Sequence, residues 1–278
     1  MVSTKRINPA PLLQPFVSGY ALRTFDTGQM ELRKYMHAVQ ESYMTLFLKD
    51  KFCEVRNDSD ELLGSASSTI VALLTESKGY SCFKGNFELF CVQFRCNGLF
   101  AIFGIPQKTL IDTIIPVEAV LGNEINLLIG ELASSKNIFE MTGHMDAYLL
   151  RAMSRQKHKS YTKSIAYSSE LIEKDRGNFS LNRMAHNANM SFRNFERRFA
   201  DEVGMPPKLY ARITRFNSAL EHKVVNPGKK WSDIVHEYGY FDQAHFIKEV
   251  KAFSSKAPDE LFRNVSPAAE SDINKLAH

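Results

Sequence analysis

The sequence has few of the features that would place it in a membrane, an extracellular space or a metal-binding class. No apolar run reaches the ~20 residues needed to span a bilayer, and the N-terminus lacks the apolar core of a signal peptide. The cysteines include no CxxC pair; they are Cys53, Cys82, Cys91 and Cys96. We therefore expect a cytoplasmic protein that does not enter membranes and whose thiols are buried and reduced.

The net charge is also low, at +4 over 278 residues, but it is unevenly distributed. Residues 1–156 carry 15 Lys and Arg against 16 Asp and Glu, whereas residues 157–264 carry 19 against 13. A chain of this length can form two domains with separate cores. The positive excess in the second half is what a domain that binds phosphates requires.

One pattern in the second half occurs twice, 51 positions apart. In residues 191–199 and again in residues 242–250, apolar residues spaced four apart enclose a basic residue, which predicts a helix with one packed and one cationic face. Each copy opens on a good N-cap residue and follows a short amphipathic run that ends in a turn, at Asn189 or Gly239. Short helix, tight turn and basic helix together predict two helix-turn-helix units.

The segment between the two copies predicts a long connecting helix. Pro206 and Pro207 suit a helix start, and residues 226–228 read Asn-Pro-Gly, which is a stop signal. Apolar residues recur at helical spacing between these signals. A helix of roughly 20 residues is about 30 Å long, close to the ~34 Å between successive major grooves on one face of B-DNA. This geometry favours DNA binding.

Residues from about 160 to 264 are similar to the DNA-binding domain of the AraC/XylS family of bacterial transcription regulators. The similarity is carried by Phe195, Arg197, Phe199, Gly204 to Tyr210, Arg215, Ala219, Ile234, Val235, Gly239, Tyr240, Asp242 to Phe246, Lys251, Pro258 and Arg263. The sequence departs from the family pattern at Asn189, where the family often has Gly, and at Val250, where it usually has Phe. The resemblance implies a sequence-specific transcription regulator whose partners are double-stranded DNA and RNA polymerase.

The resemblance also implies which side chains contact DNA. Base contacts are expected from the solvent-facing positions of the two basic helices, at Arg193, Asn194, Glu196, Arg197, Gln243, His245 and Lys248. Phosphate contacts are expected from Ser191, Arg198, Lys208 and Lys251. Arg197 has the alternative of pairing with Glu196 or Asp201. The first helix has more hydrogen-bonding reach, so we expect it to supply most of the specificity and the second helix mostly phosphate anchoring.

The first half of the chain predicts short strands followed by helices. Strand-length apolar runs separated by turn residues lie between positions 42 and 94, while residues 1–20 are expected to be an extended lead-in. This half resembles, more weakly, the sensory half of many AraC-like regulators, which is a cupin-like barrel with a helical dimerisation segment. His37 and His144 stand alone and no H-x-H pattern occurs, so we expect neither a metal nor another cofactor.

The expected fold is therefore α+β, with three parts. Residues 1–155 form a sensory and dimerisation domain, a small and degenerate cupin-like β-barrel with flanking helices. Residues 160–264 form the all-α DNA-binding domain, with two helix-turn-helix motifs joined by a long helix. Residues 265–278 are expected to be a flexible tail.

Two apolar features of the first half have more than one interpretation. The phenylalanines between positions 83 and 103 are either the core of the barrel or an apolar pocket for a small-molecule effector. The pocket candidates are Phe83, Phe90, Phe94 and Phe100. A helical stripe suits an interdomain or homodimer contact; it comprises Ile125, Leu128, Ile129 and Leu132.

Two other functions compete with regulation. One is an enzyme, either a cupin-type catalyst or a cysteine-based DNA alkyl-acceptor protein with an AraC-like domain. The sequence offers no histidine ligand set and no nucleophile–base pair, and Cys91 and Cys96 lie in an apolar context that is poor for an activated thiolate. The other is an architectural or anti-activator protein that works without a small effector. We expect a regulator that is not an enzyme.

Overall fold

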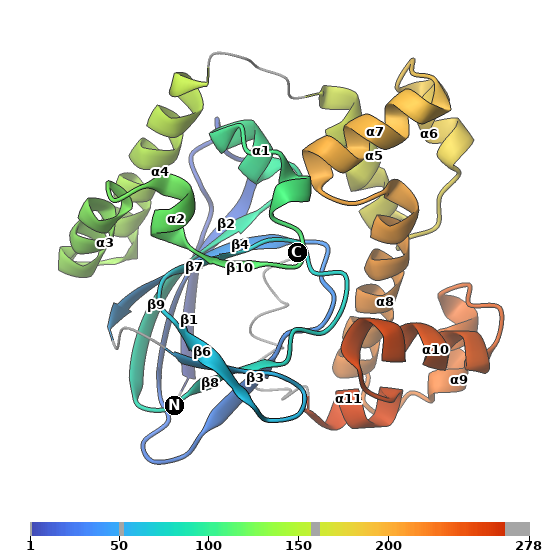
Figure 1. The fold of residues 1–278 in the computed structure, drawn as a ribbon, viewed down its shortest axis with the longest axis horizontal. Coiled ribbons are helices and arrows are strands. Elements are labelled where there is room, and N and C mark those ends of the chain that lie inside the picture. Colours follow the sequence, from blue (N-terminus) through green and yellow to red (C-terminus); the bar gives the residue numbers. More distant parts are fainter. Residues whose placement is uncertain (1, 50–52, 157–161, 265–278) are drawn as a thin grey trace.

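The computed structural model describes residues 2–49, 53–156 and 162–264. The expected tail at 265–278 lies outside the described residues. Figure 1 shows a β-rich N-terminal half beside a helical C-terminal half. None of the described helices is both long and apolar enough to cross a membrane.

The N-terminal half contains two antiparallel sheets. The larger has six strands in the order β1 (Val2–Ile7), β2 (Val17–Asp26), β9 (Asn86–Phe94), β4 (Ser42–Lys49), β7 (Thr69–Val71) and β10 (Ile114–Pro116). The smaller has four, in the order β3 (Leu32–Tyr35), β8 (Tyr80–Phe83), β5 (Cys53–Arg56) and β6 (Leu62–Ala66). The residues expected to be a lead-in contain β1 and the start of β2, and the prolines lie in the turn between these strands.

The prediction of a β-barrel is wrong in one respect, because the strands do not form a closed barrel. Among the described residues no strand pairing joins the two sheets, whose edges are β1 and β10 in one and β3 and β6 in the other. The segment at residues 36–41, between β3 and β4, packs instead against the C-terminal half. A helix of that half therefore covers the open side, where a closed barrel would have further strand pairing.

Helices cover one face of the larger sheet (Figure 1). They are α1 (Gly98–Phe103), α2 (Val117–Leu121), α3 (Ile125–Ser134) and α4 (Ile138–Arg155). The short helix η1 (Gln107–Thr109) lies against the C-terminal half instead. Ile125, Leu128 and Leu132 are at most 3 % exposed because they pack into this core. The stripe that we expected to form an interdomain or homodimer contact thus faces the core of its own domain. Leu127 and Phe139 remain on the surface, each 73 % exposed.

Within residues 162–264 the C-terminal half contains helices and no strands. They are α5 (Lys163–Lys174), α6 (Leu181–Asn187), α7 (Phe192–Val203), α8 (Pro207–Val225), α9 (Trp231–Glu237), α10 (Gln243–Ser254) and α11 (Pro258–Asn264). The pairs α6–α7 and α9–α10 lie at opposite ends of α8 (Figure 1). Phe195, Phe199 and Phe246 are at most 1 % exposed and form the core of the two units, together with half-buried Trp231.

Direct contacts fasten the two halves together. The Asn217 side chain on α8 donates to the Ala38 carbonyl at 3.0 Å, and the Ala38 N–H donates to the Phe253 carbonyl at 2.8 Å. At the other end of α8, Lys108 of η1 forms a 2.6 Å ion pair with Asp201 of α7. Both helix-turn-helix units are thereby held against the N-terminal half, so a change in that half can reach either of them.

Candidate DNA-binding surface and adjoining cavity

The turns of the two units have the same geometry. Asn189 and Gly239 both adopt a left-handed backbone, with φ of 52° and 66°. The N–H of the next residue closes each turn, from Met190 to the Ala185 carbonyl at 3.0 Å and from Tyr240 to the Val235 carbonyl at 3.1 Å. A left-handed asparagine is tolerated better than most side chains, which explains why this unit keeps its turn without glycine. The predicted turns are confirmed.

Both basic helices begin at the expected cap residues. The Ser191 hydroxyl accepts a hydrogen bond from the Asn194 N–H at 3.4 Å, and the Asp242 carboxylate accepts one from the His245 N–H at 2.7 Å. These caps satisfy one free N–H at each helix start and leave the positive end of the helix dipole at the surface.

The first basic helix, α7, presents its charged residues away from the core. Arg193 and Arg197 are exposed, while Asn194 and Glu196 are partly exposed. The Arg197 guanidinium donates to the Asn194 side-chain oxygen at 3.0 Å and lies 3.4 Å from the Asp201 carboxylate. The structure therefore shows the alternative pairing with Asp201, in a surface pair weak enough for DNA to compete with it.

The second basic helix, α10, has a similar division of faces. Gln243, His245 and Lys248 are exposed, whereas Glu249 on the opposite side is 4 % exposed. Glu249 accepts a 2.5 Å hydrogen bond from the Nε of Arg212 on α8. This pair, in which only the carboxylate is buried, ties α10 to the connecting helix and so sets the position of the exposed side chains.

The four predicted phosphate contacts differ in their surroundings. Ser191, Lys208 and Lys251 are exposed. Arg198 instead donates to the Thr162 hydroxyl at 3.0 Å and lies 3.6 Å from the buried carboxylate of Glu202. Arg198 thus holds α7 to the start of α5, and it would have to leave these partners to reach a phosphate.

The connecting helix sets the separation of the two units. It has 19 residues, which corresponds to a length of about 28 Å. Arg215 on this helix donates to the Gly177 carbonyl at 3.2 Å and lies over the Tyr240 ring. It therefore braces the domain rather than facing solvent.

A family model described as a helix-turn-helix domain matches residues 184–264, the segment that contains both units. The match begins within α6, ends with α11 and contains most of the residues that resemble the AraC pattern. Residues 184–264 therefore form a helix-turn-helix domain. No curated protein matches the sequence as a relative.

Three solved structures have a distant likeness to this chain. ToxT from Vibrio cholerae O395 is 10 % identical, with 89 % of this chain and 98 % of ToxT covered and a TM-score of 0.47. ToxT from strain SCE256 with a bound unsaturated fatty acid is also 10 % identical, with 89 % and 96 % covered and a TM-score of 0.49. The AraC-like transcriptional activator CuxR is 10 % identical, with 78 % and 86 % covered and a TM-score of 0.26. Likenesses of this size carry no argument about function.

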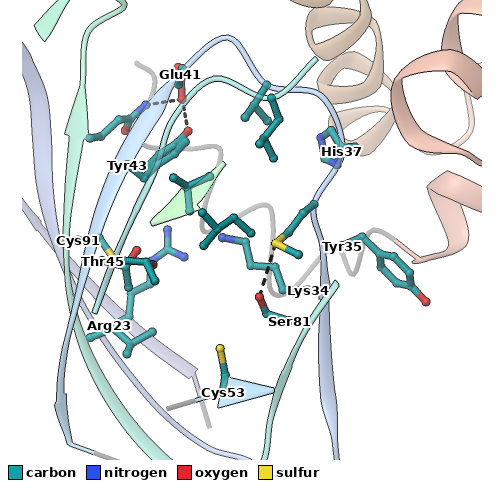
Figure 2. Close-up of a pocket in the computed structure, with 18 of the residues that line it drawn as sticks. Arg23, Lys34, Tyr35, His37, Glu41, Tyr43, Thr45, Cys53, Ser81 and Cys91 are labelled. Carbon is teal, nitrogen blue, oxygen red and sulfur yellow. Dashed lines mark hydrogen bonds between the residues drawn. The ribbon is translucent and has the colours of Figure 1, made fainter. Parts of the chain in front are cut away.

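A cavity of about 290 Å³ adjoins the AraC-type domain (Figure 2). Alternate residues of three strands line it: Ala21, Arg23 and Phe25 of β2, Tyr43, Thr45 and Phe47 of β4, and Leu89, Cys91 and Gln93 of β9. Asn217 and Glu221 of α8 also line it. The helix that connects the two helix-turn-helix units is therefore one wall of a cavity in the N-terminal half.

Strand alternation decides which of the predicted pocket residues reach this cavity. Phe83 lines it. Phe90 and Phe94 point to the opposite face of β9, where they pack with the covering helices, and Phe100 lies on α1. Successive side chains of a strand point to opposite faces, so residues 89, 91 and 93 line the cavity and residues 90 and 94 do not.

The polar groups of the cavity are partly satisfied. Glu41 accepts a hydrogen bond from the Gln93 side chain at 2.7 Å and another from the Tyr43 hydroxyl, and burial raises the pKa of Glu41. Burial lowers the pKa of His37 to about 4, so its ring is neutral at pH 7. The Nε of Arg23 is buried and has no partner among the described residues. Figure 2 shows this side chain inside the cavity near Thr45.

The cavity residues do not form a metal site. Within residues 2–49, 53–156 and 162–264, no three His, Cys, Asp or Glu side chains gather closely enough to hold an ion. The sequence patterns did not predict the roles of Arg23 or Asn217. Arg23 could have been found from the alternation of β2, but nothing local in the sequence places α8 against the sheet.

Proposed function

We propose that the protein binds one DNA duplex through two successive major grooves, with α7 in one groove and α10 in the next. The observation that carries this proposal is the repeated unit at both ends of α8, because each unit presents exposed polar and basic side chains from a capped helix. A rod of about 28 Å brings the units close to the ~34 Å spacing of the grooves.

We infer that α7 supplies most of the specificity. It presents two exposed arginines, and arginine pairs with both major-groove acceptors of guanine. Arg197 is already oriented by Asn194, which lowers the entropy lost on binding. On α10, Gln243 is the best base reader, while Lys248 and Lys251 suit phosphate anchoring.

Selection of bound sites from a random duplex pool at two salt concentrations tests both parts. We expect a motif with two half-sites about one helical turn apart. Arg193→Ala should weaken preference at one base pair by about 1–3 kcal/mol, whereas Lys251→Ala should weaken binding to all sequences alike. Failure to retain any duplex at low salt would refute the function itself. A larger loss of preference from Gln243→Ala than from Arg193→Ala would refute only the ranking.

We further propose that a small amphipathic effector occupies the cavity and acts through α8. The apolar walls suit an apolar body, and the unpaired Nε of Arg23 suits an acceptor on a polar head. An occupant would contact the strands and α8 at the same time. It would therefore favour one position of the DNA-binding units relative to the N-terminal half. Thermal unfolding with pairs of apolar acids and their alcohols tests this: the acid should stabilise the wild type more, and Arg23→Met should remove the difference.

The alkyl-acceptor alternative receives no support from the thiols. All four cysteines are buried, and burial raises the pKa of Cys53, of Cys96 and, to about 11, of Cys82. A protonated thiol is a poor nucleophile. The mass of the whole protein after exposure to methylated DNA should therefore stay unchanged.

A further inference from the structure

The aromatic side chain at the start of α10 is unusually exposed. Phe241 has 91 % of its surface in solvent, more than any other large apolar side chain in the part of the chain that the structure describes. The next is Met30, at 77 %. A phenylalanine gains nothing from this position in the free protein, because burial in an apolar environment is what stabilises it. The exposure points to a partner that covers the ring.

The backbone on both sides holds Phe241 at the surface. The preceding residue, Tyr240, is buried, and its ring lies 5.0 Å from that of Phe246. The following residue, Asp242, is fixed as the cap of α10 through its bond to the His245 N–H. Since neither neighbour can move without losing these contacts, the ring cannot turn into the core. It stands beside the exposed residues that begin the helix.

This position is the one from which a helix-turn-helix unit contacts base edges. The N-terminal residues of a recognition helix lie closest to the bases in the major groove. The apolar group that a phenylalanine can meet there is the C5-methyl of thymine. The domain around it carries the chain's excess of positive charge, which favours DNA over other partners. The first unit also has an aromatic residue near its cap, Phe192, which is 46 % exposed.

We propose that Phe241 is a specificity-determining residue that packs against the C5-methyl group of a thymine in the half-site of α10. This inference rests on the proposed binding of α10 in a major groove. It adds an aromatic base contact to a helix whose other exposed side chains near its start are Gln243, Ala244 and His245. It also predicts which base pair α10 prefers at one position.

Uracil substitution isolates the methyl group, because uracil differs from thymine only by its absence. Each thymine of the selected site is replaced singly by uracil, and the affinity is measured for the wild type and for Phe241→Ser. The wild type should lose roughly fourfold in affinity at one thymine of the α10 half-site, as expected for one buried methyl group. Phe241→Ser should bind the thymine and uracil duplexes equally well.

Met30→Ser is the matched control, since it removes another exposed apolar side chain from the sheet domain and should keep the methyl dependence. An equal loss in wild type and Phe241→Ser, or no dependence on any methyl group, overturns the role of Phe241. That result with duplex binding intact leaves the proposed function standing. Absence of any selected duplex refutes the proposed function instead. If the Phe241 ring contacts a protein partner instead of DNA, the wild type and Phe241→Ser should lose the same affinity on uracil substitution. Operator binding should then be unchanged in Phe241→Ser.

Discussion

The carboxyl group of Glu173 gives a sharp test of how α5 packs against α8 within the C-terminal half. Glu173 lies on α5 and accepts a hydrogen bond from the buried Tyr210 hydroxyl on α8. Burial is the main cause that raises its pKa from 4.5 to about 7, and the negative charges of Glu41 and Glu170 act in the same direction. The hydrogen bond from Tyr210 and the charge of Arg95 oppose this shift.

The sign of the effect on stability follows from proton binding. Between pH 4.5 and pH 7 the folded protein keeps a proton on Glu173 that the unfolded chain has released, so stability falls as the pH rises through this window. The loss is complete above pH 7. A shift of this size corresponds to about 3 kcal/mol. Glu173→Gln carries no titrating proton and can still accept from the Tyr210 hydroxyl, so it removes the penalty at high pH.

Urea unfolding of the whole chain at pH 5, 6, 7 and 8 measures this. Glu173→Gln should differ little from the wild type at pH 5 and should be more stable by about 3 kcal/mol at pH 8. Glu170→Gln is the control, because this exposed neighbour on the same helix should give a small effect at every pH. A gain from Glu173→Gln that is the same at pH 5 and pH 8 would contradict the reasoning, since it could not come from a proton.

Three further outcomes follow from single contacts. Arg212→Ala should destabilise the protein by about 1–3 kcal/mol in urea, because it removes the hydrogen-bond donor of the buried Glu249 carboxylate. Gly177→Ala should destabilise it by at least about 2 kcal/mol by thermal unfolding, since the added carbon would lie 2.2 Å from the Ala211 carbonyl oxygen at a φ of +80°. Leu127→Ser should raise the dissociation constant of any homodimer in sedimentation equilibrium without lowering stability, because this side chain is 73 % exposed.

The DNA-binding half could be predicted from the sequence because its signals are local. A cap residue, a left-handed turn residue and apolar residues at helical spacing each act within a few positions, and all of them recur in the second unit. The burial of Phe195 and Phe246 and the bounds of α8 follow from the same spacing. The contacts that hold Arg198 do not, since Thr162 lies 36 positions away.

The fold of the N-terminal half could not be predicted in the same way, because strand pairing joins segments that are distant in the chain. The apolar stripe of α3 was visible in the sequence, but its direction was not: it packs inward, against the sheet. Local patterns also could not show that the two sheets are not joined by strand pairing, or that α8 forms one wall of the cavity. The sequence by itself determined two helix-turn-helix units, because each unit is specified by residues that lie close together in the chain. Only the contacts of Asn217 with Ala38 and of Lys108 with Asp201 decided how those units are joined to the domain beside them.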